Sequence, residues 1–197
     1  MKTRDGETRR ETGETRIRMR LGLDGPPSSS IRTGLPFLDH MLDAFATHGR
    51  FALEAEAQGD VQVDPHHLVE DCGICLGATL AEALKDGRPT ARAGCFLFPM
   101  DRSLAQVALD LCGRPNLVWE VELEPQPLGG IDPRLFQDFF KGLADAARAT
   151  IHVRLLARDN DHHAVEAVFK AFGRALREAV APVEGSGPVS TKGKIDA

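Results

Sequence analysis

Residues 66–84 read HHLVEDCGICLGATLAEAL, and residues 162–180 read HHAVEAVFKAFGRALREAV. The two stretches align without a gap at a constant offset, 162 − 66 = 96. Identical positions include the two histidines, the glutamate that follows them and a glycine, namely His66/His162, His67/His163, Glu70/Glu166 and Gly77/Gly173. A match of this kind indicates that the chain contains a duplicated supersecondary unit.

The similarity continues upstream of the two stretches. FLDHMLDAF (37–45) resembles LFQDFFKGL (135–143) at an offset of 135 − 37 = 98, which differs from the first offset by a two-residue loop insertion. In this register His40 corresponds to Asp138. Both residue types can bind metal ions, so their equivalence gives weight to a histidine that would otherwise be interpreted as a core residue.

Periodicity and turn residues predict a similar order of elements in both halves. We predict strands at 15–23, 50–58, 94–99, 103–111, 116–124 and 149–157, and helices at 36–47, 66–86, 133–147 and 162–181. Two β-rich units with two helices each favour an α+β sandwich that has helices on one side of each sheet.

We divide the chain into a first half, 1–92, a second half, 93–182, and a C-terminal segment, 183–197. The C-terminal segment lacks an apolar period, which favours disorder. Its STKGK stretch is nevertheless small, basic and rich in donors, which is typical of phosphate-binding segments. Both interpretations stay open.

Composition excludes several classes of function. The 197 residues are 42% hydrophobic and 27% charged, with a formal net charge of −5, so a broad nucleic-acid-binding face is not expected. No apolar run is long enough for a membrane span, and we expect no membrane partner. The charged stretch MKTRDGETRRETGETR (1–16) has no apolar core of a secretory signal, so we expect a cytoplasmic protein.

The four cysteines allow two interpretations. Cys72 and Cys75 form a CxxC, which zinc sites and redox sites also contain. No second CxxC is present, and the pair lies in an apolar helical stretch. We therefore expect these cysteines to be reduced and buried.

The doubled HHxxE motif predicts a metal site. On a helix, His66 and Glu70 lie on one face, while His67 points about 100° away and can serve a second metal or the other side of a cluster. His162, Glu166 and His163 repeat this pattern. Imidazole with carboxylate suits manganese, iron, zinc or nickel better than magnesium or calcium. One such motif could be a surface or capping feature, but two copies at equivalent positions favour metal binding.

Adding His40 and Asp138 gives four ligand-capable residues in each half. Eight donors suit two metal ions with open positions for a substrate. The predicted ligands are His40, His66, His67, Glu70, Asp138, His162, His163 and Glu166.

These residues resemble one family, imidazoleglycerol-phosphate dehydratase. The matching strings are RRETGETRIRMRLGLDG, RTGLPFLDHMLDAFATHG, DPHHLVEDCGICLG, DNDHHAVEAVFKAFGRALREA and STKGK, in the family's order along nearly the whole chain. The resemblance implies two four-stranded sheets with a helical layer, a fold like ribosomal protein S5 domain 2. It also implies a homo-oligomer of 24 subunits with two Mn²⁺ per subunit at subunit contacts.

The implied reaction belongs to histidine biosynthesis. It removes water from D-erythro-imidazoleglycerol phosphate and gives imidazole acetol phosphate. The proton on C2 of the glycerol chain is not acidic, because no carbonyl group neighbours it. Metal-bound imidazolate would expel the C3 hydroxyl through a diazafulvene-like intermediate, with the metals as template and electronic switch.

The resemblance also assigns roles outside the metal ligands. Glu14 matches a glutamate that contacts substrate and is a candidate acid or base, although as a lone residue it would be an exposed carboxylate at a strand edge. His48 matches a histidine near the reacting hydroxyl, and it is either a proton donor or a helix C-terminal cap. Glu166 counts as a catalytic residue as well as a ligand. The phosphate contacts implied are Arg92, Arg114, Lys170, Ser190 and Lys192.

This chain departs from the family pattern at Asp138, in QDFF, where family members carry histidine, or sometimes another residue, in an EHFF-like helix. A carboxylate can replace imidazole on manganese, so we expect activity to persist with a changed metal preference or affinity. His152 has no equivalent among the predicted ligands, because 152 − 96 gives Glu56. We expect it in the core or behind the ligands.

Two other classes of function share the same ligands. A dinuclear metallohydrolase such as a phosphatase would release phosphate, although the aspartate-rich strings of phosphatases are absent from this sequence. A metal-binding assembly module without catalytic activity would bind metal and would have no turnover to lose on mutation of Glu14.

Overall fold

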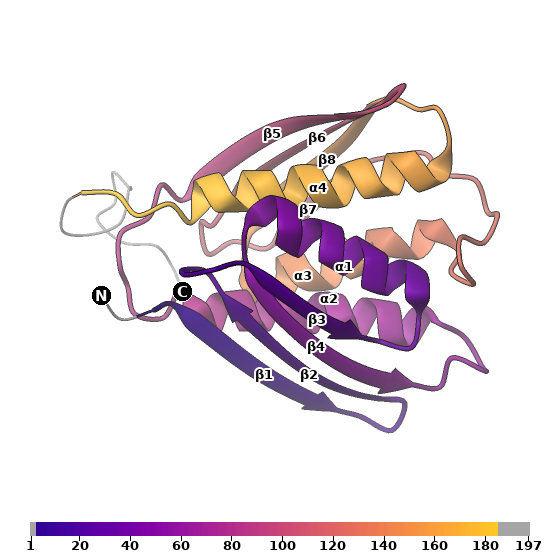
Figure 1. The fold of residues 1–197 in the computed structure, drawn as a ribbon, viewed down its shortest axis with the longest axis horizontal. Coiled ribbons are helices and arrows are strands. Elements are labelled where there is room, and N and C mark those ends of the chain that lie inside the picture. The colour runs from indigo at the N-terminus through magenta and orange to yellow at the C-terminus, as the bar shows by residue number, and fades with distance from the viewer. Residues whose placement is uncertain (1–2, 185–197) are drawn as a thin grey trace.

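The computed structural model describes residues 3–184, and Ser190 and Lys192 lie outside this range. The chain forms two units with the same order of elements, strand–strand–strand–helix–strand–helix (Figure 1). The first unit contains β1 (Asp5–Glu11), β2 (Thr15–Gly22), β3 (Ser28–Arg32), α1 (Pro36–Gly49), β4 (Ala52–Gly59) and α2 (His66–Ala83). The second contains β5 (Ala93–Met100), β6 (Ser103–Asp110), β7 (Asn116–Glu120), α3 (Phe136–Ala147, after a 3-10 turn at Pro133–Leu135), β8 (Thr150–Ala157) and α4 (Asp161–Ala179).

Each unit builds one four-stranded sheet, and the two sheets have equivalent strand orders, β1-β2-β4-β3 and β5-β6-β8-β7. In both sheets three strands are antiparallel neighbours, while β3 and β7 run parallel to β4 and β8. The structure thus confirms the α+β class, the duplication and the two four-stranded sheets. The boundaries at residues 92 and 182 remain a prediction.

Two strands of the first unit were not predicted from the sequence. Both β1 and β3 are edge strands, and charged or hydroxyl side chains dominate DGETRRE and SSSIR. An edge strand needs few apolar residues, since much of its surface faces solvent, so the hydrophobic period is too weak to detect. The predicted strand 116–124 is also too long, because β7 ends at Glu120.

The four helices lie between the two sheets (Figure 1). Helix α2 covers β1 and β2 and packs on α3, while α4 covers β5 and β6 and packs on α1. One hydrophobic cluster runs through both units and is rich in phenylalanine between the helices, including Phe45, Phe136, Phe139, Phe140, Phe169 and Phe172. The helix contacts are therefore made across the units, and the two halves share one core.

The repeated glycine has the same role at both helix contacts. A Cβ added at Gly77 would lie 2.4 Å from the carbonyl oxygen of Leu143 on α3, and a Cβ at Gly173 would lie 2.5 Å from that of Phe45 on α1. Leu143 and Phe45 are equivalent in the 98-residue register. Only glycine lets the helix backbones approach this closely, which explains its presence in both copies.

Two arginines, one half-buried and one fully buried, connect the units. Arg177 of α4 donates hydrogen bonds to the carbonyl oxygens of Gly49, Leu23 and Arg50, at 2.6 to 2.8 Å. Arg4 is fully buried, donates to the carbonyl oxygen of Val180 at 2.6 Å, and forms an ion pair with Asp24 at 2.7 Å. Backbone carbonyls at chain ends and turns are thus satisfied by guanidinium groups from the other unit.

Two predictions about side-chain burial were wrong, one for Cys95 and one for His152. Cys72, Cys75 and Cys112 are buried free thiols, but Cys95 is exposed, because its position in β5 points away from the helices. His152 was expected in the core or behind the ligands, and it is instead exposed on the outer face of β8. Its neighbours Ile151 and Val153 are buried, and successive strand residues face opposite sides.

Within residues 3–184, none of the helices combines the length and the apolar character that crossing a membrane requires.

The Arg4–Asp24 pair predicts a pH-dependent stability. Hydrogen bonds from Arg4 lower the pKa of Asp24 from 3.8 to about 2, although burial opposes this shift. Because the folded pKa lies below the unfolded value, the stabilisation is complete above about pH 4 and is lost as the pH falls towards 2. A shift of this size corresponds to about 2 kcal/mol.

We therefore expect Asp24→Asn to lower the free energy of unfolding by about 2 kcal/mol near pH 7, measured by urea unfolding. The difference from wild type should shrink as the pH approaches 2. Asp5→Asn is the matched control, because Asp5 is exposed on β1 and has no ion pair within the described part of the chain. Equal effects of both substitutions near pH 7 would contradict this account.

Candidate metal centre

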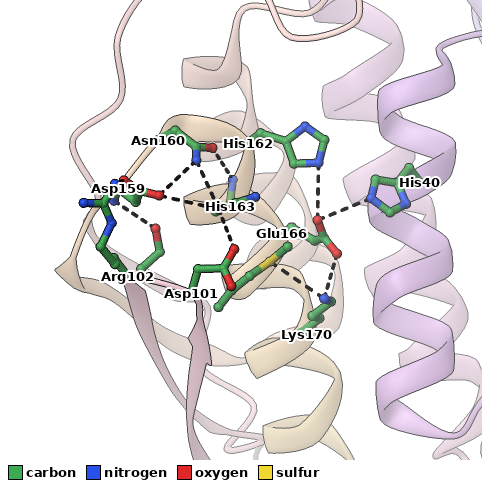
Figure 2. A network of polar contacts seen from close by, with 11 residues as sticks. His40, Asp101, Arg102, Asp159, Asn160, His162, His163, Glu166 and Lys170 are labelled. Carbon is green, nitrogen blue, oxygen red and sulfur yellow. Dashed lines mark hydrogen bonds and ion pairs between the residues drawn. The ribbon is translucent and has the colours of Figure 1, made fainter.

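Three predicted ligands meet at the contact between α1 and α4. The Nε2 atoms of His40 and His162 lie 3.4 and 3.3 Å from Oε2 of Glu166 (Figure 2). All three residues offer a donor atom within 4.8 Å of the others. His162 and Glu166 are one turn apart on α4, and His40 comes from the facing helix, so the contact between the units assembles the cluster.

Glu166 is a buried carboxylate with 7% of its surface exposed, whereas both histidines are exposed. Burial alone would raise the pKa of Glu166, but the Lys170 ammonium 2.7 Å away and the His40 imidazole outweigh burial and lower that pKa. The carboxylate is consequently charged at neutral pH and can bind a cation.

An equivalent cluster lies at the contact between α2 and α3. His66 Nε2 is 3.9 Å from Glu70 Oε2 and 3.6 Å from Asp138 Oδ2. His66, Glu70 and Asp138 are the repeat counterparts of His162, Glu166 and His40. The second cluster is more open than the first, because Glu70 is about half exposed where Glu166 is buried.

The remaining two histidines point away from these clusters. His67 Nδ1 lies 3.3 Å from Asp60 and 3.7 Å from Glu14, and His163 Nδ1 lies 3.4 Å from Asp101 and 3.9 Å from Asp159. In Figure 2, His163 points toward Asp159 and Asn160, whereas the carboxylate of Glu166 faces His40 and Lys170. The 100° step along a helix separates the inner pair of predicted ligands from the outer histidine in both units.

We call His67 and His163 the outer histidines. Each has one acidic residue from a β-hairpin, Glu14 or Asp101, and one from the loop before its helix, Asp60 or Asp159. A hydrogen bond with Asp60 raises the pKa of His67, and the charges of Glu14 and Asp64 contribute, against a smaller effect of burial.

His48 lies in the last turn of α1, where its ring meets that of Phe98 edge-on with centroids 5.0 Å apart. Burial lowers its pKa, and the positive charges of Lys170 and Arg174 lower it further. His48 is therefore neutral near pH 7, and it can exchange hydrogen bonds with a ligand without adding charge.

The predicted phosphate contacts occupy two separate places. Lys170 belongs to the first cluster, with its ammonium between Glu166 and Met100 Sδ at 3.8 Å. Arg92 precedes β5 and forms an ion pair with Asp110 at 2.6 Å, and Arg114 follows β6, where its carbonyl accepts a hydrogen bond from Thr150. Arg92 and Arg114 thus lie at the end of β5 opposite Met100.

The donor set fits a transition metal. Ligands that bind an ion at about 2.1 Å stand about 3 Å from one another, which the 3.3 and 3.4 Å separations in the first cluster approach. Imidazole nitrogen and carboxylate oxygen are the ligands that manganese, iron and zinc share. Asp138 supplies a carboxylate where the first cluster has the imidazole of His40, so the two clusters differ in charge as well as in exposure.

Sequence reasoning identified Glu14 but missed the other three acidic residues around the outer histidines, Asp60, Asp101 and Asp159. Asp60 and Asp159 lie in the loops before the two HHxxE helices, so the acidic stretches upstream of both motifs were an available signal. Asp101 had no such signal, because only the hairpin between β5 and β6 brings it beside His163.

Comparisons with known proteins agree with one another. Residues 33–176 match the family model described as imidazoleglycerol-phosphate dehydratase. The chain is 46% identical to the imidazoleglycerol-phosphate dehydratase of Desulfitobacterium hafniense (strain Y51) over 99% of this chain and 100% of that one. It is 50% identical to that of Bacillus cereus (strain AH187), with 98% and 100% covered.

Solved structures give the same result. The fold matches the crystal structure of imidazoleglycerol-phosphate dehydratase from Staphylococcus aureus subsp. aureus N315 with a TM-score of 0.81 and 38% identity, covering 91% of this chain and 99% of that one. It matches the enzyme from Pyrococcus furiosus in complex with (S)-C348 with a TM-score of 0.78 and 37% identity, covering 95% and 99%.

The environment of His67 predicts how metal binding depends on pH. An imidazole must be deprotonated to bind a metal ion, so Mn²⁺ affinity should fall as the pH drops from about 8 to about 6. Because Asp60 raises the pKa of His67, Asp60→Asn should move the midpoint of this fall to lower pH, measured by Mn²⁺ titration. An affinity that does not change over this range, or a midpoint that moves upward in the variant, would contradict the assignment of His67 as a ligand.

Proposed function

The chain belongs to the imidazoleglycerol-phosphate dehydratase family, and from this premise we propose a manganese-dependent dehydration of D-erythro-imidazoleglycerol phosphate to imidazole acetol phosphate. Family membership makes the chain an enzyme of histidine biosynthesis, a dehydratase and therefore a lyase. The observation that carries the proposal is the pair of equivalent ligand clusters at the two helix contacts.

We assign two Mn²⁺ per subunit to these clusters. His40, His162 and Glu166 would hold one ion, and His66, Glu70 and Asp138 would hold the other. The outer histidines His67 and His163 point away from both clusters, which supports their binding an ion held by another subunit. Bound Mn²⁺ would supply a Lewis acid that orients the substrate's imidazole ring and stabilises it as imidazolate.

The chain's own residues supply the proton transfers. Glu14 is 56% exposed and lies 3.7 Å from His67, so its carboxylate can reach a ligand beside the metal site and move the proton of substrate C2. His48 is neutral near pH 7, and its imidazole can hydrogen-bond to the C3 hydroxyl. The proton that Glu14 takes from C2 balances the proton that this hydroxyl takes up to leave as water. Lys170 keeps Glu166 charged next to the reacting centre.

The distance between the metal residues and two of the predicted phosphate residues, Arg92 and Arg114, supports a site shared by two subunits. β5 has eight residues, which span about 26 Å, with Arg92 before its start and Asp101, the neighbour of His163, after its end. A substrate with a three-carbon chain between ring and phosphate extends only about 10 Å. Arg92 and Arg114 of one subunit must therefore bind the phosphate of a substrate whose ring lies at another subunit's metal residues.

A site of this kind makes assembly part of the activity. We propose the homo-24-mer that the family resemblance implies, with metal ions at subunit contacts. Ser190 and Lys192, which lie outside the described residues, would add phosphate contacts from the C-terminal segment. The cytoplasmic location expected from the sequence stays a prediction.

The reaction separates this proposal from a phosphatase or a metal-binding module. Metal-loaded, assembled protein should convert imidazoleglycerol phosphate to its ketone product only with Mn²⁺ present, and should release no inorganic phosphate. Absence of turnover or release of phosphate would contradict the proposed reaction.

Glu14→Gln should lower kcat by about a hundredfold or more, because general acid–base groups contribute on that scale, while metal content and particle mass persist. Full activity of the Glu14→Gln variant would contradict the proposed role of Glu14.

The shared site predicts complementation between two inactive variants. Arg114→Ala should remove a phosphate contact and His163→Ala a metal ligand, so that each homo-oligomer has little activity. Dissociating the two with a chelator, mixing them and reassembling with Mn²⁺ should restore a substantial part of the turnover, because some sites then combine intact residues from both. A mixture that stays as inactive as its components would show that each site belongs to one chain.

A further inference from the structure

The turn that carries Glu14 is held by its neighbours on the chain. Thr12 Oγ1 accepts hydrogen bonds from the backbone N–H groups of Glu14 and Thr15, at 3.1 and 3.0 Å. The carbonyl oxygen of Glu14 accepts from the N–H of Asp60 at 3.2 Å, and Asp60 also contacts His67. Both backbone groups of Glu14 therefore have a partner, which restricts where its carboxylate can lie.

A buried carboxylate lies directly beneath this turn. Asp71 is on α2, and 7% of its surface is exposed. Its Oδ2 accepts a hydrogen bond of 2.5 Å from the Thr15 hydroxyl, and its Oδ1 lies 2.8 Å from Arg10 Nε in an ion pair that is not aligned as a hydrogen bond. The Thr15 hydroxyl is also 3.2 Å from that of Thr12, so a continuous polar chain joins Asp71 to the turn.

The second unit shows that the fold does not need the charged groups Asp71 and Arg10, although it keeps a buried hydroxyl at Ser103, which accepts a hydrogen bond from the N–H of Asp159 at 3.0 Å. The register of β2 and β6 makes Ser103 the counterpart of Thr15, and Phe98 the counterpart of Arg10 through the pairs Arg10–Ile17 and Phe98–Ala105. The counterpart of Asp71 at the 96-residue offset is Ala167, which is fully buried. At the equivalent position, α4 thus packs on the sheet of the second unit without a counterpart of the buried Asp71 carboxylate.

A buried carboxylate costs free energy unless it is paired, and replacing it with apolar groups is often neutral or stabilising. The first unit keeps Asp71, Thr15 and Arg10 where the second unit uses apolar or smaller residues. The unit that retains them is also the one whose hairpin carries Glu14. The fold therefore does not require the charges of Asp71 and Arg10, which leaves the adjacent Glu14 turn as the feature of this unit that they can serve.

We propose that Asp71 is a positioning residue that holds Glu14 beside the metal-binding helix through the Thr15 hydroxyl. Asp71 lies on α2, the helix that bears His66, His67 and Glu70, so the polar chain connects the ligand helix to the Glu14 turn with one buried hydrogen bond. Displacing a catalytic group by about 1 Å can lower the rate about a hundredfold, so this connection matters for turnover. The inference rests on the proposed role of Glu14.

Thr15→Val tests the inference because valine keeps the shape of threonine and removes the hydroxyl. In the assembled, Mn²⁺-loaded enzyme we expect kcat to fall about tenfold to a hundredfold with KM changed less than about threefold. Thr15→Ser, which restores a hydroxyl, should keep kcat within about threefold of wild type. Metal content should match wild type in both variants.

A double variant shows whether Thr15 acts through Glu14. Once Glu14 is Gln, adding Thr15→Val should lower kcat by less than about twofold, because the positioned carboxylate is already gone. Asp71→Asn, which keeps a weaker acceptor for the Thr15 hydroxyl, should behave like Thr15→Val with a smaller loss. Thr79→Val is the matched control, since Thr79 is a buried threonine of α2 whose hydroxyl donates to the Cys75 carbonyl within the same helix.

Hydrogen exchange provides a measurement that does not depend on activity. A peptide spanning residues 11–17 should exchange faster in Thr15→Val than in wild type and Thr79→Val. Equal exchange in all three, an equally large loss in Thr15→Ser, or a full further loss of kcat in the Glu14→Gln background would overturn the inference. If Glu14→Gln alone keeps wild-type turnover, the proposed role of Glu14 fails, and exchange in this peptide still decides whether Asp71 holds the turn.

Discussion

Two helix contacts carry the predicted ligand residues, and in each a glycine lies against a backbone carbonyl of the partner helix. Gly77 and Gly173 leave no room for a Cβ at these contacts. Glu70 and Glu166 come seven residues, or two turns, before these glycines, so each glutamate lies on the same helix face and points at the same partner helix. The close approach that glycine permits is what brings Asp138 to His66 and His40 to Glu166.

The duplication could be predicted from the sequence because identical residues recur at a constant offset. The buried strands and the four helices follow from their apolar period, and so does the position of the ligands on the helices. The edge strands β1 and β3 could not be predicted in this way, because their residues face solvent and carry no such period. His152 was misplaced for a related reason, since a polar residue in a strand is assigned to a face only when its neighbours are known to be buried.

For the site, sequence reasoning identified residue types but not their grouping. The 100° helical step separated His67 and His163 from the inner residues, but the sequence could not show that His40 meets Glu166 or that Lys170 lies far from Arg92 and Arg114. These relations depend on which helices pack together and which strand ends lie near them. The same holds for Asp71, which follows a predicted ligand but acts on a hairpin 56 residues away. The two units serve as controls for each other, since a feature present in only one of them is not required by the fold.

The central claim is that the two helix contacts of each chain form two metal sites, completed by outer histidines of neighbouring subunits. Metal analysis of the assembled particle, after dialysis against Mn²⁺ and removal of excess ion, tests it most directly. The account predicts about two Mn²⁺ per chain in wild type and about one in a variant that lacks the second cluster's Glu70 and Asp138. One ion per chain in wild type, or an unchanged count in the variant, would contradict it.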